Sequence, residues 1–489
     1  MQASPTRPQN ITKNLTAIYA IQTTSILAFA ILFSTLVLYM TQKLGLSPQF
    51  ANAIMGGFVA FRYGLHLLGG YFSGRWLSNR KIFSIGVLLQ ILACFFLMDK
   101  SLSHFYLGLS CFLLGVGLNM TCINMILTQL FDAKDKRRES AFLINYSCMN
   151  IGFLLGYSLA GYFQLKQDFL SLFWICITAN LITLFLTFFS WSLIKDYSTQ
   201  LIEIAKTHGQ KKVFTRSIIG LVLIMAMIPV LNILLQHIQQ SNAFVLIISG
   251  VVFALLFILS FSQRNKSARD KMLAYIIFAI GALAFWTLYD LVPMGLTLFA
   301  QYNVDRVVMG IEIAPQWIQE VNSIIIILGG PLSIIALKAI RKRYYFSLPQ
   351  QFALAIFLIG SGYLLLNLGI HFANAQGYVA FSWIVLCYVF QSFGELMIGP
   401  IGYAMIGQLA PEKLQGIMMG SWMMVVGAGG VLASYSSNSA ISSMHGTNPL
   451  TTNPGYGHVF GSLGLLAVIV SLVMALLMPK LKRLIHEKG

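Results

Sequence analysis

The segment FQSFGELMIGPIGYAMIGQLAP, residues Phe390–Pro411, places a single charged residue, Glu395, in the middle of an apolar run. A charge at the centre of a bilayer costs about 2.5 to 3.5 kcal/mol, so such a residue normally faces a partner or a water-filled cavity. Glu395 is therefore either part of a cavity for a polar solute or a packing residue satisfied by a neighbouring Tyr or Gln. Its surroundings must decide.

The composition predicts an integral membrane protein. Of the 489 residues, 57% are hydrophobic and only 10% are charged, and the mean hydropathy is +0.76. Run after run reaches about 20 apolar residues, the length that a helix needs to cross a bilayer. The N-terminus, MQASPTRPQNITKNL, is polar and has no apparent cleavable signal peptide.

The cysteines indicate neither disulfides nor a metal site. All six lie in apolar segments without CxxC spacing or a clustered histidine, so we expect small core residues. They are Cys94, Cys111, Cys122, Cys148, Cys176 and Cys387.

Hydrophobic runs bounded by polar turns predict an all-α fold with fourteen transmembrane helices. Six spans are followed by a polar stretch, then by two spans and a further six. The predicted spans are 15–42, 50–74, 82–98, 103–131, 140–164, 168–194, 216–237, 242–262, 272–301, 313–338, 350–371, 378–409, 415–436 and 457–479.

The loop charges predict that both termini are cytoplasmic, because cytoplasmic loops are rich in Lys and Arg. With the N-terminus inside, the outer loops hold only Lys43, Lys100, Lys166 and Arg306. The net charge of +17 then reflects topology and anionic lipid rather than nucleic-acid binding. The inner loops hold Arg75, Arg80, Lys81, Lys134, Lys136, Arg137, Arg138, Lys206, Lys211, Lys212, Arg216, Arg264, Lys266, Arg269, Lys271, Lys338, Arg341, Lys342 and Arg343.

The six, two and six arrangement predicts a major facilitator fold built from two repeats. We expect an N-terminal bundle over residues 1–195 and a C-terminal bundle over 269–489. A cytoplasmic linker and the inserted helix pair occupy 196–268 between them.

Few charged residues lie inside the spans, and each is a candidate for function. Asp290 and Glu320 accompany Glu395 in the last six spans, with Glu320 near an aqueous mouth. Arg62 and His66 are four residues apart and so share one face of the second helix. Arg62 could bind a substrate carboxylate or neutralise an acidic neighbour, whereas His66 is either a proton carrier or a hydrogen-bonding core residue.

Several long motifs, in order, resemble the proton-dependent oligopeptide transporter (POT) family. WIVLCYVFQSFGELMIGPIGYAMIGQLAPEKLQGIMMGSW looks like its signature segment, and FWTLYDLVPMGLTLFAQYNVDR resembles its seventh core helix. APQWIQEVN resembles the start of the eighth, and KRRESAFLINYSCMNIGFLLGYSLAGY the region of the fourth and fifth. The resemblance covers nearly the whole chain, and the helix pair at 216–262 is what prokaryotic members carry.

The resemblance implies import of di- and tripeptides driven by inward proton flow through alternating access. It places Glu395 where the family attracts the peptide amino terminus, and Asp290 at a position linked to protonation and the outer gate. The remaining matches are candidate cavity residues, although Trp422 could simply pack. They are Tyr146 and Asn150 on the fifth helix, Gln319 and Asn322 on the eighth, and Trp422 on the eleventh.

The chain also departs from the family at charged positions. The first-helix motif E-x-x-E-R is absent, and Gln22, Ser25 and Ile26 stand at its two glutamates and arginine. Met120 replaces the fourth-helix lysine, and Gly74 replaces a loop aspartate. The carboxyl-binding half of the usual site has therefore lost its charges, unless Arg62 has taken over that contact.

We therefore predict a secondary transporter whose proton coupling, if present, rests on Asp290, Glu320, Glu395 or His66. The alternatives are a carrier, importing or exporting and possibly uncoupled, for another polar amine-bearing metabolite, and a transport-dead transceptor of the same fold. A membrane enzyme is disfavoured because no HExxH, GxSxG or Walker-type motif is present. We expect a monomer in a bacterial inner membrane, with protons and lipid as partners, no nucleic acid, no metal, and no cofactor beyond the proton gradient.

Overall fold

The computed structural model describes residues 11–485 except 133–134, 136, 342–345 and 442–446; within that range, side chains are described except at 330–345, 400–401, 403–404 and 412. The basic loop residues Lys134, Lys136, Lys342 and Arg343 fall outside the described residues. The chain divides into two compact units, each of which is mainly helical. The first contains Met1–Thr35 and Phe61–His237, and the second contains Leu36–Ala60 and Ile238–Gly489.

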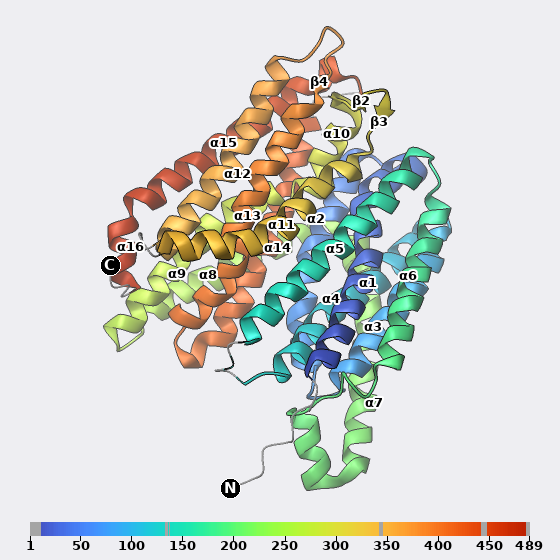
Figure 1. Ribbon diagram of the computed structural model, residues 1–489, viewed down its shortest axis with the longest axis vertical. Coiled ribbons are helices and arrows are strands. Elements are labelled where there is room, and N and C mark those ends of the chain that lie inside the picture. The colour runs from blue at the N-terminus through green and yellow to red at the C-terminus, as the bar shows by residue number, and fades with distance from the viewer. Residues whose placement is uncertain (1–10, 133–134, 136, 342–345, 442–446, 486–489) are drawn as a thin grey trace. The chain divides into compact units, whose positions relative to one another are not determined.

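The first unit is an all-helical bundle (Figure 1). Helix α4 packs along α3 and α3 packs against α6. The two glycines of the α3–α4 contact bring the backbones together, since a Cβ on Gly115 would lie 2.4 Å from the carbonyl oxygen of Gly86. The helices are α1 Ile11–Leu38, α2 Pro48–Phe72, α3 Asn79–Met98, α4 Leu102–Gln129, α5 Arg137–Leu165, α6 Phe169–Phe189 and α7 Gln200–Gln236.

The second unit has α12 between α13 and α15, with α14 against α9. Glycine again allows close approach, because a Cβ on Gly360 would lie 2.9 Å from the carbonyl oxygen of Gly464. Its helices are α8 Ile238–Phe261, α9 Lys266–Tyr289, α10 Thr297–Asn303, α11 Pro315–Arg341, α12 Leu348–His371, α13 Phe381–Leu409, α14 Gln415–Ile441, α15 Pro449–Leu476 and α16 Met478–Leu484. Its short helical turns are η1 Tyr39–Lys43, η2 Val292–Leu296 and η3 Glu412–Leu414. Its two-residue strands are β1 Val304–Asp305, β2 Val307–Val308, β3 Ile311–Glu312 and β4 Val379–Ala380.

Residues Leu36–Ala60, which include the end of α1 and the first half of α2, belong to the second unit, and this half of α2 packs on α14. The Asn52 amide donates to Asn438 Oδ1 at 3.1 Å, and Asn438 donates to the Gln49 carbonyl at 3.1 Å. One turn along α2, a Cβ on Gly56 would lie 2.6 Å from that of Ser434. Helix α8 joins this contact, since Asn242 donates to the Ala53 carbonyl at 3.0 Å.

The all-α polytopic membrane fold is confirmed. Within the described residues, twelve helices are long and apolar enough to cross a membrane. Helices α2 and α11 are not among the twelve, so the count of fourteen spans and the cytoplasmic placement of the termini stay predictions. Helix α7 begins at Gln200, well before the predicted residue 216, and bends at Gly209, where φ is +78° (Figure 1).

The segment predicted as one helix over 272–301 is broken in the structure. Helix α9 ends at Tyr289, the π-helical turn Val292–Leu296 follows, and α10 begins at Thr297. Pro293 has no N–H for the carbonyl four residues earlier, which explains why the helix cannot continue. Distant side chains satisfy the break: Tyr363 donates to the Leu288 carbonyl at 2.7 Å, and Ser437 accepts from the Gly295 N–H at 3.1 Å.

The linker after α6 is fastened to the loop between α2 and α3. Asp196 accepts the Asn79 backbone N–H at 3.0 Å and its side-chain amide at 2.7 Å, so it caps the N-terminus of α3. Gly74, at φ +70°, accepts the Leu201 N–H at 2.9 Å through its carbonyl. A Cβ at Gly74 would lie 2.8 Å from Thr199 Cγ2, which explains why no aspartate stands there.

Candidate functional site

Glu395 lies at the midpoint of α13 and is 9% exposed. Tyr289 Oη donates to Glu395 Oε2 at 2.9 Å, and Asn322 Nδ2 donates to the same oxygen at 2.7 Å. Asn322 also donates to Ser392 Oγ at 3.1 Å. Three helices, α9, α11 and α13, therefore build one polar cluster, which we call the Glu395 cluster: Glu395, Tyr289, Asn322 and Ser392.

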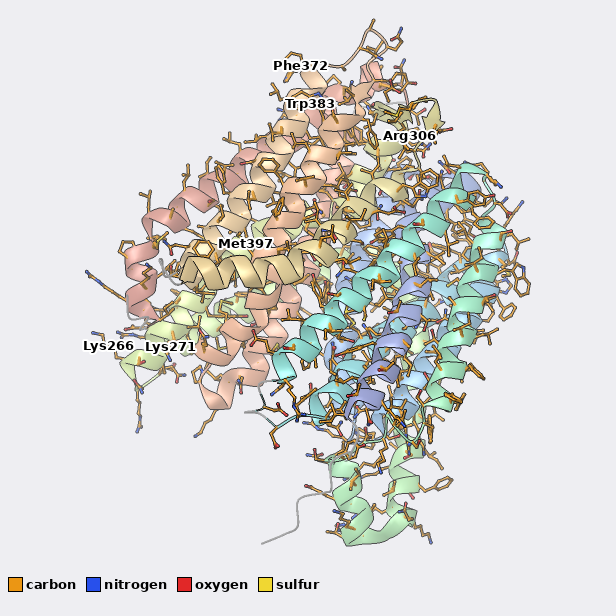
Figure 2. The ribbon with its side chains drawn as sticks, viewed as in Figure 1. Lys266, Lys271, Arg306, Phe372, Trp383 and Met397 are labelled. Carbon is orange, nitrogen blue, oxygen red and sulfur yellow. The ribbon has the colours of Figure 1, made fainter. Side chains whose placement is uncertain are left out.

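The cluster lies deep within the second unit. Figure 2 shows Lys266 and Lys271 at one end of this unit and Arg306, Phe372 and Trp383 at the other. Met397, two residues beyond Glu395 on α13, lies between these ends. Both hydrogen bonds described above come to the Glu395 carboxylate from neutral groups, the Tyr289 hydroxyl and the Asn322 amide.

Asp290 follows Tyr289 directly and stands at the break between α9 and η2. It is 4% exposed. A Cβ on Gly430 of α14 would lie 3.5 Å from Asp290 Oδ2, so the carboxylate lies against the backbone of α14 at this glycine. The side chains of these two neighbouring residues therefore contact different helices: Tyr289 binds Glu395 of α13, and Asp290 lies against α14.

The residues predicted on α11 have different surroundings. Asn322 belongs to the Glu395 cluster, whereas Gln319, which is 1% exposed, donates to Thr297 Oγ1 at 3.1 Å. Thr297 opens α10, so Gln319 helps to hold the helix where it resumes after the break. Glu320 lies on the same helix and is half-buried.

Trp422 lies in the core of the second unit. It is 2% exposed, its ring packs edge-on to Phe352 with centroids 6.3 Å apart, and a Cβ on Gly402 would lie 2.4 Å from it. These contacts agree with the packing alternative for Trp422. In this conformation its ring is closed off by α12 and α13.

The first unit holds the other predicted residues. Asn150 of α5 is 4% exposed and donates to the Tyr146 carbonyl one turn earlier at 3.0 Å. Tyr146 is partly exposed. Arg62 and His66 lie one turn apart on α2, and the Nε2 of His66 is a buried atom without a hydrogen-bond partner among the described residues.

The aligned first-helix positions are apolar or neutral in the structure as well as in the sequence. Gln22 is 2% exposed, and its side-chain amide donates a hydrogen bond to the sulfur of Met120 at 3.8 Å. Ser25 is 7% and Ile26 is 8% exposed. These four residues offer no charge to a solute.

Sequence reasoning missed Tyr289 and Ser392. Tyr289 lies in an aromatic run, FWTLYD, where nothing distinguishes a polar partner from a packing ring. The available signal was its position directly before Asp290 and four residues before Pro293, because a helix break changes the direction of the side chains beside it. Ser392 is three residues before Glu395 and therefore on the same helix face.

The chain matches known transporters over most of its length. Residues 80–447 match the POT family. The dipeptide and tripeptide permease B of Salmonella typhimurium is 30% identical over 458 residues, covering 93% of this chain and 92% of the permease. The dipeptide and tripeptide permease A of Chromobacterium violaceum is 28% identical over 490 residues, covering 99% of this chain and 96% of the permease.

Solved structures agree on the fold. A peptide transporter POT in complex with sulfate superimposes with a TM-score of 0.83 at 21% identity, covering 99% of this chain and 98% of that one. A POT family transporter in complex with 5-aminolevulinic acid gives a TM-score of 0.80 at 20% identity and covers 96% of both chains.

These matches confirm the resemblance seen in the motifs. The relatives are bacterial permeases, which confirms the transporter class over an enzyme and the multi-pass bacterial inner-membrane location. On the family match and the 30% identity over nearly the full length, the chain belongs to the POT family.

Proposed function

We propose that this protein imports di- and tripeptides, or solutes that resemble them, by alternating access coupled to inward proton flow. The Glu395 cluster carries the proposal. A carboxylate oriented by neutral donors deep in the membrane domain is suited to receive the amino group of a peptide, since a buried carboxylate gains most from a cation.

The charge distribution of the second unit supports this role. Its six predicted core spans contain three acidic residues, Asp290, Glu320 and Glu395. They contain no Lys or Arg except Lys338 at the end of one span. This surplus of acidic residues suits a solute that carries an amino group, and the permeases that the chain resembles are named for dipeptides and tripeptides.

Proton coupling belongs to the proposal too. With no carboxylate on the first helix, the candidate coupling groups within the spans are Asp290, Glu320, Glu395 and His66. If a carboxylate binds a proton more tightly in one conformation than in another, protonation shifts the equilibrium toward the first conformation. Proton coupling requires such a difference in proton affinity between the conformations. Asp290 is well placed to act so, because the helix changes direction beside it.

The test is uptake of labelled dialanine into proteoliposomes under an imposed inward proton gradient. We expect gradient-driven uptake by the intact protein and its loss in Glu395→Gln. Glu203→Gln is the matched control, because Glu203 is an exposed carboxylate at the start of α7, far along the chain from the cluster. Equal uptake by both variants would refute the role of Glu395.

A second candidate is a carrier for a small amino acid-like metabolite. One structural neighbour was solved with 5-aminolevulinic acid, which has an amine and a carboxylate as a peptide has. Counterflow of labelled 5-aminolevulinic acid in the absence of dialanine uptake would favour this candidate. Binding of either solute without counterflow would instead indicate the transport-dead transceptor.

A further inference from the structure

Arg62 lies near the midpoint of α2, within a set of aromatic rings. Its guanidinium carbon is 5.2 Å from the ring centre of Phe29, 5.4 Å from that of Phe33 and 4.7 Å from that of Tyr63. All three distances are within the range of a cation–π contact. We call these three rings with Arg62 the Arg62 cradle.

The cradle faces the interior of the first unit. Phe29 is 4% exposed. Its ring centroid lies 6.5 Å from that of Phe112 on α4 and 6.0 Å from that of Phe153 on α5. One turn along α2, the carbonyl of His66 accepts from the Thr121 hydroxyl of α4 at 2.9 Å. This side of α2 therefore packs on other helices and does not face lipid.

The cradle contains a charge but no counter-charge. Among the described residues, Arg62 makes no hydrogen bond and no ion pair, and its Nε is a buried atom without a hydrogen-bond partner. The first six predicted spans contain no Asp or Glu except Asp168, at the start of the sixth. Neutralising an acidic neighbour, one of the two roles considered for Arg62, therefore finds no partner among the described contacts of this residue.

The rings stabilise the positive charge but leave its hydrogen-bonding capacity unused. A guanidinium carries five N–H donors in a fixed planar fork, which matches a carboxylate in a bidentate arrangement. Aromatic faces cannot accept this pair of parallel N–H···O hydrogen bonds. A partly exposed arginine with aromatic walls and open donors is therefore suited to a planar anion attached to an apolar group.

We propose that the Arg62 cradle binds the carboxylate of the transported solute. It would replace the contact that the family makes from the first and fourth helices, where this chain has Gln22, Ile26 and Met120. Gln22 and Met120 contact each other, and Arg62 is the only Lys or Arg within the first six predicted spans. The inference rests on the proposed function, because it assigns a residue that recognises the carboxylate of the proposed peptide solute.

The test measures binding of three dialanine derivatives by titration calorimetry. Alanyl-alanine has both charged ends, its C-terminal amide lacks the carboxylate, and its N-acetyl form lacks the amine. We expect the intact protein to bind alanyl-alanine at least tenfold more tightly than the amide. In Arg62→Gln this preference should disappear with binding of the amide unchanged, and Arg62→Lys should retain part of it.

Arg75→Gln is the matched control. Arg75 also lies over an aromatic ring, that of Tyr71 at 5.1 Å, but it is exposed in the loop after α2. Its replacement should leave the preference for the carboxylate intact. Arg62→Gln and Arg62→Lys should both keep the unfolding temperature of the intact protein within a few degrees, which separates lost recognition from lost folding.

Each remaining outcome separates the two proposals. An unchanged preference in Arg62→Gln, or equal weakening of alanyl-alanine and its amide, overturns the cradle while leaving the Glu395 proposal in place. N-acetyl-dialanine bound as tightly as dialanine, through Arg62, would support the cradle and refute the amine site. If none of the three derivatives binds the intact protein, both proposals are wrong.

Discussion

Replacing Gly74 by alanine tests why this chain has glycine where its family has an aspartate. Two costs can be separated. The backbone at Gly74 has φ +70°, a conformation that costs an L-residue about 1 to 2 kcal/mol. The new Cβ would also lie 2.8 Å from Thr199 Cγ2, and such overpacking costs about 1 to 3 kcal/mol. We expect Gly74→Ala to destabilise the protein by about 2 to 5 kcal/mol.

Gly45→Ala is the control for the first cost alone. Gly45 has φ +67°, but a Cβ there would meet nothing within 4 Å. Its replacement should cost only the conformational part, about 1 to 2 kcal/mol. The smaller entropy of the unfolded chain affects both variants alike and cancels in the comparison.

The assay is thermal unfolding in detergent, read as the apparent melting temperature. Gly74→Ala should melt clearly below Gly45→Ala, and Gly74→Ala with Thr199→Ala should recover part of the difference, because Cγ2 is removed. Equal melting temperatures for Gly74→Ala and Gly45→Ala would show that the linker does not pack on the loop. The reasoning about the missing aspartate would then be wrong.

Three further predictions test other contacts. Tyr289→Phe removes one donor to Glu395. Because hydrogen bonds to charged groups are worth about 1.5 to 3 kcal/mol, dialanine should bind at least about tenfold more weakly in calorimetry; unchanged affinity would contradict the orienting role. Burial raises the pKa of the Asp196 carboxyl, so stability in thermal melts should be highest in acid and decline as the pH rises through that raised pKa. Asp196→Asn should lose this decline while it keeps an acceptor for the helix cap; a parallel decline in both proteins would contradict the prediction. Gly430→Ala places a Cβ 2.6 Å from a side chain of α2 and should slow dialanine uptake, whereas Gly416→Ala, on the same helix with nothing within 4 Å, should not.

Much of the fold could be predicted from hydrophobic runs alone, because a membrane helix must satisfy its backbone internally and so appears as one apolar segment. The start of α7 could not be predicted so, because residues 200–215 are too polar and charged to form an apolar run and α7 bends at Gly209 within them. The break after Tyr289 was missed for another reason. Pro293 was visible in the sequence, but the groups that satisfy the break come from Tyr363 and Ser437, far along the chain.

The candidate site was predicted less completely. A carboxylate in an apolar run is conspicuous, which is why Glu395 and Asp290 were identified, and Asn322 was identified through its motif. Tyr289 was not, since a tyrosine among aromatic residues gives no sign of which partner its hydroxyl finds. The rings around Arg62 were missed similarly: Phe29 and Phe33 are ordinary members of an apolar helix until the structure brings Arg62 to them.

The break between α9 and α10 has a mechanical consequence. In hydrocarbon no water can replace a lost backbone hydrogen bond. Tyr363 and Ser437 take the place of that solvent, and a straight helix could form there only if both contacts were given up. The segment therefore consists of two helices joined at a break whose Leu288 carbonyl and Gly295 N–H are satisfied from outside, so the helix changes direction beside Asp290 without leaving either group unpaired.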